Sequence, residues 1–151
     1  MADIKSPEAR SLNMSKIKSK DTKPEEYIRK RLYAAGFRYR KNYREITGCP
    51  DAWLPKYNLA VFVHGCFWHR HRNCKYAYSP KSRESFWESK FQRNIERDRS
   101  VRNELSQKGT RVLVIWECTI RRMIKSTEFE KECLKRICEF VVGSDCQDYE
   151  L

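Results

Sequence analysis

The residue types best suited to acid–base chemistry and metal binding gather in one short segment of the chain. All 3 histidines of the protein lie between residues 64 and 71, with Cys66 and Cys74 beside them. The segment follows an apolar run over residues 59–63, which is typical of a buried strand. A strand that ends in clustered histidine, cysteine and aromatic residues indicates a functional site mounted on a rigid scaffold.

The spacing Cys66-x4-His71-x2-Cys74 is compatible with three ligands around one metal ion. Thiolates together with an imidazole favour zinc over magnesium or calcium. A fourth ligand must come from elsewhere: Cys118, at the end of a predicted strand, is the first candidate and His69 the second. Three cysteines and one histidine would form a closed, structural site. The alternative is a set of reduced cysteines without a metal, since buried free cysteine is common.

His64 and His69 remain available for catalysis if zinc occupies the neighbouring cluster. Histidine transfers protons near neutral pH, most effectively when a carboxylate orients its ring. Asp98 falls within the apolar stripe of a predicted helix, where a carboxylate needs a partner, and His69 would supply one. Asp51 follows Pro50 at the start of a predicted strand, where its carboxylate could hold Mg²⁺. A metal beside a neutral histidine suits phosphodiester hydrolysis, whereas each residue taken singly has a simpler structural explanation.

Aromatic side chains accompany these residues. Phe67 and Trp68 lie in a polar loop and are hard to bury together, and Phe86-Trp87 opens a long predicted helix. Adjacent aromatic residues on a basic surface can wedge between base pairs. We therefore expect DNA contacts at this loop, although Trp87 is equally well explained as a core residue.

The composition favours a protein that binds nucleic acid. The formal net charge of +12 indicates a polyanionic partner, and no basic amphipathic anchor points to a membrane. At 151 residues and 40% hydrophobic content the chain fits one globular domain, residues 1–151, without an apolar run of the ~20 residues that a membrane span needs. The first residues lack a signal-peptide core, so we expect a cytoplasmic protein with reduced cysteines. A basic protein without such a partner is the alternative.

Helix signals bracket the segment that precedes the first strand. Thr22 and Glu25 form a capping box with Pro24 in the first turn, and Gly36 is the expected end of the helix. The capping box explains Glu25 without a catalytic role. Residues 1–21 are polar and basic, and we expect them to form a DNA-binding arm, with a frayed terminus as the alternative.

The remaining patterns predict a sheet flanked by helices. Three short strands over 37–43, 52–54 and 59–63 suggest an antiparallel meander, and the most hydrophobic run, 111–117, predicts a central strand. Helical periodicity predicts helices over 83–108 and 126–142. Residues 143–151 are expected to form a flexible acidic tail.

The run Phe-Val-His-Gly-Cys-Phe-Trp-His at 62–69 resembles the signature of the very-short-patch repair (Vsr) endonucleases, which nick DNA beside a T/G mismatch. The similarity covers most of residues 10–120. It continues in order through Asn13-Met14, residues 19–25, Pro50-Asp51, Phe86-Trp87, residues 94–98 and residues 114–118.

The resemblance implies a restriction-endonuclease-like fold of the α/β (α+β) class, in which helices flank a mixed β-sheet beside a structural zinc site. It implies Mg²⁺-dependent nicking 5′ to the mismatched thymine, as a monomer, in a cytoplasm shared with a cytosine-5 DNA methyltransferase and downstream repair proteins. The implied roles are Asp51 and the carbonyl of Val63 on Mg²⁺; His69 with Asp98 as the base; His64 and Glu25 at the active site; Cys66, His71, Cys74 and Cys118 on zinc; Phe67, Trp68 and Trp87 in the major groove; and Met14 in the minor groove.

Two positions depart from related patterns. Many nucleases of this superfamily carry an acidic residue on the third strand, where this chain has Val63, and this departure disfavours ordinary restriction activity. Cys49 stands where the family leads us to expect a basic residue. Two alternatives therefore stay open: a zinc-stabilised DNA-binding module without catalysis, and a sequence-specific restriction endonuclease.

Overall fold

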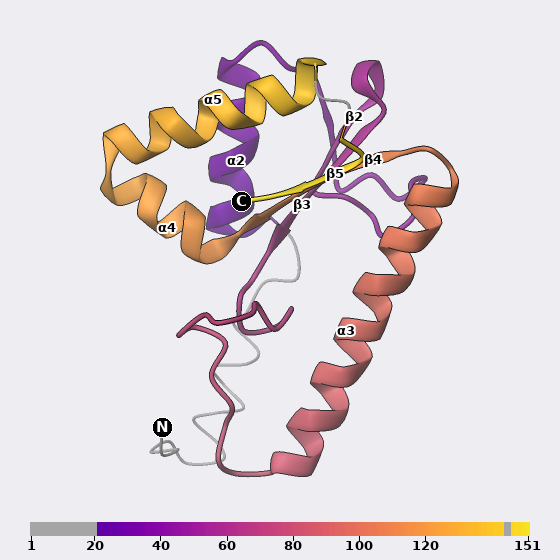
Figure 1. Cartoon of the computed structure of the whole chain (residues 1–151), viewed down its shortest axis with the longest axis vertical. Helices are drawn as coiled ribbons and strands as arrows, with labels where there is room; N and C mark the ends of the chain where they lie inside the picture. The colour runs from indigo at the N-terminus through magenta and orange to yellow at the C-terminus, as the bar shows by residue number, and fades with distance from the viewer. Residues whose placement is uncertain (1–20, 144–145) are drawn as a thin grey trace.

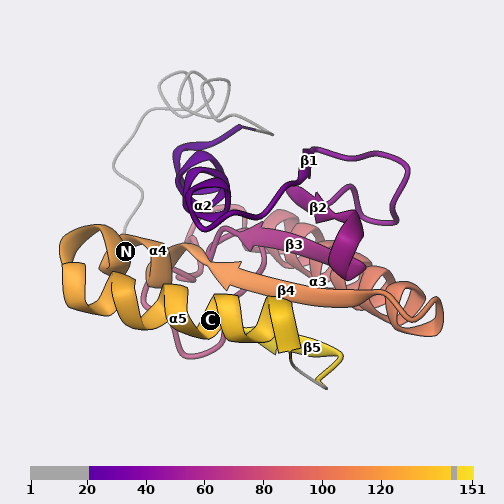
Figure 2. The ribbon, with the colours of Figure 1, turned by 90° about the horizontal axis from the view of Figure 1, so that it is seen from above.

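A computed structural model describes residues 21–143 and 146–151, whose core is a five-stranded sheet with helices on both faces (Figure 1). The strands lie side by side in the order β1 to β5 (Figure 2). In chain order the elements are α2 (Lys23–Ala34), β1 (Arg40–Lys41), β2 (Ala52–Leu54), the 3-10 turn η1 (Pro55–Tyr57), β3 (Leu59–His64), α3 (Glu84–Gln107), β4 (Arg111–Trp116), α4 (Glu117–Lys125), α5 (Thr127–Gly143) and β5 (Asp148–Glu150).

The sheet is mixed. β1, β2 and β3 are antiparallel neighbours, which confirms the predicted meander, and β4 is parallel to β3 and to β5. The crossover between β3 and β4 runs through the long helix α3, because parallel neighbours cannot be joined by a tight turn. The predicted first strand over 37–43 is wrong in length: only Arg40 and Lys41 pair with β2, and both are exposed.

Alternate residues of the strands face two different cores. Leu59 and Val61 of β3 join a cluster with α2, α4 and α5, whereas Ala60 and Phe62 pack on the side of α3. In Figure 1, α3 lies on the opposite side of the sheet from the other three helices. His64 follows the same alternation as Phe62, so its side chain belongs to the α3 side of the sheet.

The start of α2 has the predicted capping box. The Thr22 hydroxyl accepts a hydrogen bond from the N–H of Glu25, and the Glu25 carboxylate accepts one from the N–H of Thr22. The predicted helices over 83–108 and 126–142 are confirmed as α3 and α5, with boundaries within two residues. None of the helices among residues 21–143 and 146–151 is long and apolar enough to cross a membrane.

Two expectations about the C-terminal half are wrong. Cys118 does not end a strand: it lies in the first turn of α4, an unpredicted helix that buries Ile120 and Met123 in the core. Part of the expected tail forms β5, which pairs with the edge of β4 and packs Tyr149 against Phe140. The strand pairing satisfies backbone groups of β4 that would otherwise form an open sheet edge.

Candidate active site and metal centre

Five predicted catalytic side chains line one cavity of about 500 Å³ on the α3 side of the sheet. Glu25 comes from α2, Asp51 from the approach to β2, His64 from β3, His69 from the following loop and Asp98 from α3. Basic side chains also line this space, as expected for a site that receives a phosphate. They are Arg44, Arg97 and Arg102.

A glycine allows one wall of the cavity to close. Gly48 lies in the loop before β2 with φ +84°, a conformation that side chains disfavour. A Cβ at this position would lie 2.5 Å from a methyl carbon of Val101 and 3.2 Å from the ring of Phe62. The absence of a side chain therefore lets the loop that leads to Asp51 rest against α3.

Asp51 is held against the backbone of β3. Its Oδ2 atom accepts a hydrogen bond of 2.6 Å from the N–H of Val63. Burial raises the pKa of the Asp51 carboxyl to about 7; the hydrogen bond from Val63 opposes this, and the nearby Glu25 carboxylate adds to it. Two acidic side chains in a desolvated position fit a divalent cation, whose charge would stabilise the ionised carboxylate.

His69 and Asp98 are brought together although 29 residues separate them. Nδ1 of His69 lies 2.7 Å from a carboxylate oxygen of Asp98. Burial raises the pKa of Asp98, but the hydrogen bond and charge of His69 outweigh it and leave this pKa below its ordinary value. Asp98 is therefore ionised at neutral pH and accepts the hydrogen bond. In the neutral form of His69, this hydrogen bond places the proton on Nδ1 and leaves a lone pair on Nε2.

His64 lies face to face with His69. The ring centroids are 3.9 Å apart and the planes are inclined by 3°. Burial, followed by the neighbouring His69, lowers the pKa of His64 to about 3. Its Nδ1 atom is buried without a hydrogen-bond partner among the described residues. A buried polar atom without a hydrogen bond lowers the stability of the folded protein. A hydrogen bond between this nitrogen and a ligand would remove that cost.

Ligand atoms of His64, His69 and Asp98 lie close enough together to share a metal ion. The short contact between His69 and Asp98 is already a hydrogen bond that satisfies one atom of each. We therefore interpret this group as a proton-transfer pair with an adjacent neutral imidazole.

The predicted zinc ligands form a second cluster. Ligand atoms of Cys66, His71, Cys74 and Cys118 all lie within 4.8 Å of one another. Cys66 follows β3 and Cys118 follows β4, and these parallel strands place their carboxyl ends at the same edge of the sheet. Nδ1 of His71 lies 3.6 Å from the sulfur of Cys66 and 3.4 Å from that of Cys118. The prediction of Cys118 over His69 as the fourth member agrees with this geometry.

The chemistry of the cluster fits a cation. Burial raises the pKa of the Cys66 thiol to about 12 and also raises the pKa of Cys118, so without a metal both thiols stay protonated in a poor environment for charge. Three sulfurs and one imidazole are the donor set of structural zinc sites. The described cluster can hold a metal ion. Four protein ligands would fill its tetrahedral coordination and leave no position for a catalytic water.

The aromatic residues make a continuous group between the loop and α3. The ring of Phe67 lies 5.0–5.5 Å from those of Trp68, Tyr78, Trp87 and Phe91. Phe67, Trp68 and Trp87 are half-buried rather than fully exposed, because they contact one another. Met14 lies outside the described residues, so its predicted DNA contact has no structural counterpart.

Two polar residues that sequence reasoning left without this role hold the aromatic loop. Asn94 of α3 donates a hydrogen bond of 3.0 Å to the carbonyl of Trp68. Arg70 donates to the carbonyls of Phe67, Ala77 and Tyr78 while its guanidinium covers the ring of Phe91. The position of Asn94 one helical turn before Asp98 was an available signal; Arg70, within a run of basic residues, offered none.

Comparisons with known proteins place the chain among DNA endonucleases. A family model described as DNA mismatch endonuclease Vsr matches residues 2–76. The chain is 47% identical over 121 residues to the type II nicking enzyme V.NmeAIP of Neisseria meningitidis, covering 80% of this chain and 86% of that protein. It is 36% identical over 143 residues to the DNA mismatch endonuclease Vsr of Escherichia coli, covering 95% and 90% of the two chains. It is also 40% identical over 120 residues to the type II nicking enzyme V.XorIIP of Xanthomonas oryzae, covering 80% and 88%.

Proposed function

This chain belongs to the Vsr family of DNA mismatch endonucleases, and from this premise we propose that it nicks duplex DNA at a T/G mismatch, 5′ to the thymine. Endonuclease action on DNA is common to the family and to the nicking enzymes that the chain matches. The observation that carries the finer proposal is the single cavity in which Asp51 faces the His69–Asp98 pair.

We propose that the divalent cofactor is Mg²⁺ and that Asp51 and the main-chain carbonyl of Val63 would hold it. Carboxylate and carbonyl oxygens are the ligands that this ion prefers. When bound, Mg²⁺ supplies positive charge that neutralises the scissile phosphate and lowers the pKa of a coordinated water. The hydrogen bond from the N–H of Val63 keeps one oxygen of Asp51 directed at β3 and fixes the rotation of its carboxylate.

The remaining residues handle protons and orientation. Nε2 of His69 accepts a proton from the attacking water, while Asp98 keeps the proton on Nδ1 and stabilises the imidazolium that forms. His64 is neutral, and its unpartnered Nδ1 atom forms a hydrogen bond with the substrate phosphate or with a water molecule bound to that phosphate. Glu25 adds negative charge beside Asp51, which favours the cation. Its capping box with Thr22 shows how a structural role and a place in the cavity coexist.

For the second cluster we propose a structural Zn²⁺, held by Cys66, His71, Cys74 and Cys118. This ion would tie the loop after β3 to the start of α4. The loop contains Phe67 and Trp68, so zinc would hold the aromatic group in the position from which we propose that it enters the major groove with Trp87. Such aromatic wedges unstack a base step, which is easiest at a mismatch.

Several broader features are part of the proposal. We infer a restriction-endonuclease-like fold in a single domain, a monomer in the cytoplasm, and an N-terminal arm whose Met14 reaches the minor groove. The link to a cytosine-5 methyltransferase follows from the mismatch, because deamination of 5-methylcytosine produces thymine opposite guanine. The mixed sheet and the net charge of +12 support this picture.

The two alternatives explain less of the structure. A DNA-binding module would account for the zinc-type cluster, the aromatic group and the charge, but it gives no reason for a half-buried Asp51 in the same cavity as the His69–Asp98 pair. A sequence-specific restriction enzyme of the common kind would carry an acidic side chain on the third strand, where Val63 offers only its backbone.

The direct test is cleavage of end-labelled duplexes that differ in one base. With Mg²⁺, we expect a single nick in the thymine strand of a T/G duplex and none in the matched T/A or C/G duplex. The Asp51→Asn variant, which keeps an oxygen for the N–H of Val63, is the matched control and is expected to bind the duplex without cutting it. Equal cleavage of matched and mismatched DNA would refute the mismatch specificity, and cleavage by Asp51→Asn would refute the assigned chemistry.

A further inference from the structure

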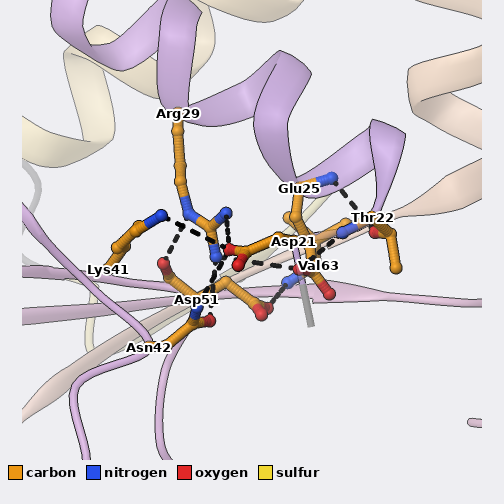
Figure 3. A network of polar contacts seen from close by, with 8 residues as sticks. All are labelled: Asp21, Thr22, Glu25, Arg29, Lys41, Asn42, Asp51 and Val63. Carbon is orange, nitrogen blue, oxygen red and sulfur yellow. Dashed lines mark hydrogen bonds and ion pairs between the residues drawn. The ribbon is translucent and has the colours of Figure 1, made fainter. Parts of the chain in front are cut away.

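A buried arginine joins three segments of the chain beside the catalytic carboxylate. Arg29 lies on α2 and is only 4% exposed. Its Nε atom donates to the main-chain carbonyl of Asp51, Nη1 donates to the carboxylate of Asp21, and Nη2 donates to the side-chain oxygen of Asn42, each at 2.9 Å. Figure 3 shows the guanidinium reaching down from α2 into the space between these residues.

The three hydrogen bonds of this guanidinium point in different directions, and only an arginine side chain can donate all three at once. A lysine ammonium is a compact charge and cannot reproduce a planar fork that donates to three separate segments. Glu25 lies 3.7 Å from the same group and completes its electrostatic surroundings. Since a buried cation without partners is very costly, the network must be complete for α2 to pack as it does.

Two of the partners are residue types that suit their backbone. Asp21 has φ +54° and Asn42 has φ +48°, the left-handed region that aspartate and asparagine tolerate better than most residues. The amide of Asn42 also donates to the carboxylate of Asp21 at 3.0 Å. Arg29 thus bonds to two tight bends of the chain, one just before α2 and one just after β1.

We propose that Arg29 is a positioning residue for Asp51, and that its bond to Asp21 ties the root of the N-terminal segment to the metal-binding carboxylate. The proposal rests on the function proposed above, in which Asp51 holds the metal. The reason is geometric. Arg29 donates a hydrogen bond to the main-chain carbonyl of Asp51, and the N–H of Val63 donates one to its carboxylate, so both the backbone and the side chain of Asp51 are fixed.

The bond to Asp21 connects the Arg29 network to the N-terminal segment. Asp21 immediately precedes the capping residue of α2, and the segment before it carries basic side chains suited to DNA phosphates. They are Arg10, Lys16, Lys18 and Lys20. DNA bound by this segment would pull on Asp21, and Asp21 shares the Arg29 guanidinium with the backbone of Asp51. The proposal therefore couples DNA binding by the N-terminal segment to the placement of the Asp51 carboxylate.

The test compares Arg29→Lys with Arg31→Gln, a matched control two residues further along α2. Arg31 pairs with Glu130 of α5 and has no contact with Asp51. Single-turnover nicking of the T/G duplex is measured at 10 °C, where every variant is confirmed as folded by circular dichroism. Mn²⁺ affinity is measured by calorimetry on the protein without DNA. Loss of a residue that orients a metal ligand costs about 10- to 100-fold in metal affinity or activity, and we expect losses on that scale in both readouts for Arg29→Lys, with Arg31→Gln within about twofold of wild type.

A milder variant isolates the coupling to the N-terminal segment. Asp21→Asn keeps a side chain that tolerates the left-handed bend and removes only the charge. We expect it to slow nicking less than Arg29→Lys does, and the double variant should be no slower than Arg29→Lys alone, because both act through one network. The affinity of each variant for matched duplex is measured in parallel, and a loss of affinity as large as the loss of nicking would assign the effect to DNA binding and overturn the positioning role.

Each outcome bears on the proposal. If folded Arg29→Lys binds Mn²⁺ and nicks DNA as the wild type does, the positioning role of Arg29 is overturned. If the losses in the double variant multiply, the link through Asp21 is overturned. If wild-type protein binds Mn²⁺ but nicks no T/G duplex, the proposed function fails while the calorimetric comparison still decides the role of Arg29. If wild-type protein binds no Mn²⁺, the metal role of Asp51 and the positioning role of Arg29 fall together.

Discussion

The imidazole rings of His64 and His69 are stacked, with centroids 3.9 Å apart and planes 3° from parallel. Two protonated rings in this arrangement would repel each other, so at most one carries a positive charge. The carboxylate of Asp98 lies against His69, and His64 has no such partner. The stack therefore supports the proposed roles, in which His69 exchanges protons and His64 stays neutral.

The neutral state of His64 can be observed directly. With its pKa lowered to about 3 by burial and by His69, its ring should show no titration between pH 5 and 8 in nitrogen-15 NMR spectra. His64→Gln identifies the signal. Because the folded-state pKa of this base lies below its unfolded value of 6.5, its contribution to stability is lost as the pH falls below about 6.5. A His64 signal that titrates near pH 6.5 would contradict the assignment.

Asp51 has the opposite linkage to pH. Its folded-state pKa is raised from 3.8 to about 7, chiefly by burial, so the protonated carboxyl favours the folded protein and this contribution is lost as the pH rises from about 4 through 7. We expect Asp51→Asn to raise the thermal unfolding midpoint of metal-free protein at pH 8 and to change it little at pH 4. Differential scanning calorimetry at both values checks this. An unfolding midpoint below that of wild type at pH 8 would contradict it.

The His69–Asp98 pair should behave as one catalytic unit. His69→Ala is expected to slow nicking by about 10²- to 10⁴-fold, the range of general-base catalysis. Asp98→Asn should slow the same step, because it removes the charge that fixes the tautomer and supports the imidazolium. The double variant should be little slower than His69→Ala alone. Single-turnover rates at saturating Mg²⁺ provide the measurement. If the losses of the two single variants multiply in the double variant, His69 and Asp98 do not act as one unit.

The cysteine cluster predicts one zinc ion per chain. Cys118→Ser should lower both the zinc content, measured by mass spectrometry of the purified protein, and the unfolding midpoint, because the ion would join the loop after β3 to the start of α4. Cys133→Ser, which replaces a core cysteine outside the cluster, should keep its zinc. Full zinc content in Cys118→Ser would require a different fourth ligand.

The aromatic group separates into two kinds of residue. Trp68→Ala should weaken binding to the T/G duplex by about 1–3 kcal/mol, the scale of one base–aromatic stack, and should affect matched duplex less. Phe67→Ala should in addition lower the unfolding midpoint, because Phe67 supports Trp87 and Phe91. Fluorescence anisotropy in Ca²⁺ measures binding without cleavage. Equal losses on both duplexes for Trp68→Ala would assign this ring to the core.

The sequence was most informative where a residue type conflicted with its surroundings. Asp98 on an apolar stripe required a partner, and the structure provides His69 at 2.7 Å. The zinc-type ligands were predictable because thiolates and imidazole are rare side chains with strict spacing. The helices α2, α3 and α5 were predictable from capping and periodicity.

The features that escaped prediction depend on tertiary pairing. β5 has a polar sequence, Asp-Tyr-Glu, and becomes a strand only because the edge of β4 offers it hydrogen bonds. α4 follows β4 without an intervening turn signal, so its start could not be located. Arg29 reads as one basic residue among many, since its three partners lie 8, 13 and 22 residues away along the chain.

The distribution of the zinc-type ligands along the chain sets an order for biosynthesis. Cys66, His71 and Cys74 leave the ribosome together, but Cys118 lies 52 residues after Cys66 and follows the whole of α3. The cluster therefore cannot close until β4 has been synthesised and has docked beside β3. Asp98 is synthesised within the same interval, after His69 and before Cys118. A nascent chain thus contains the residues of the candidate active site before the ligand set that would hold the aromatic loop is complete.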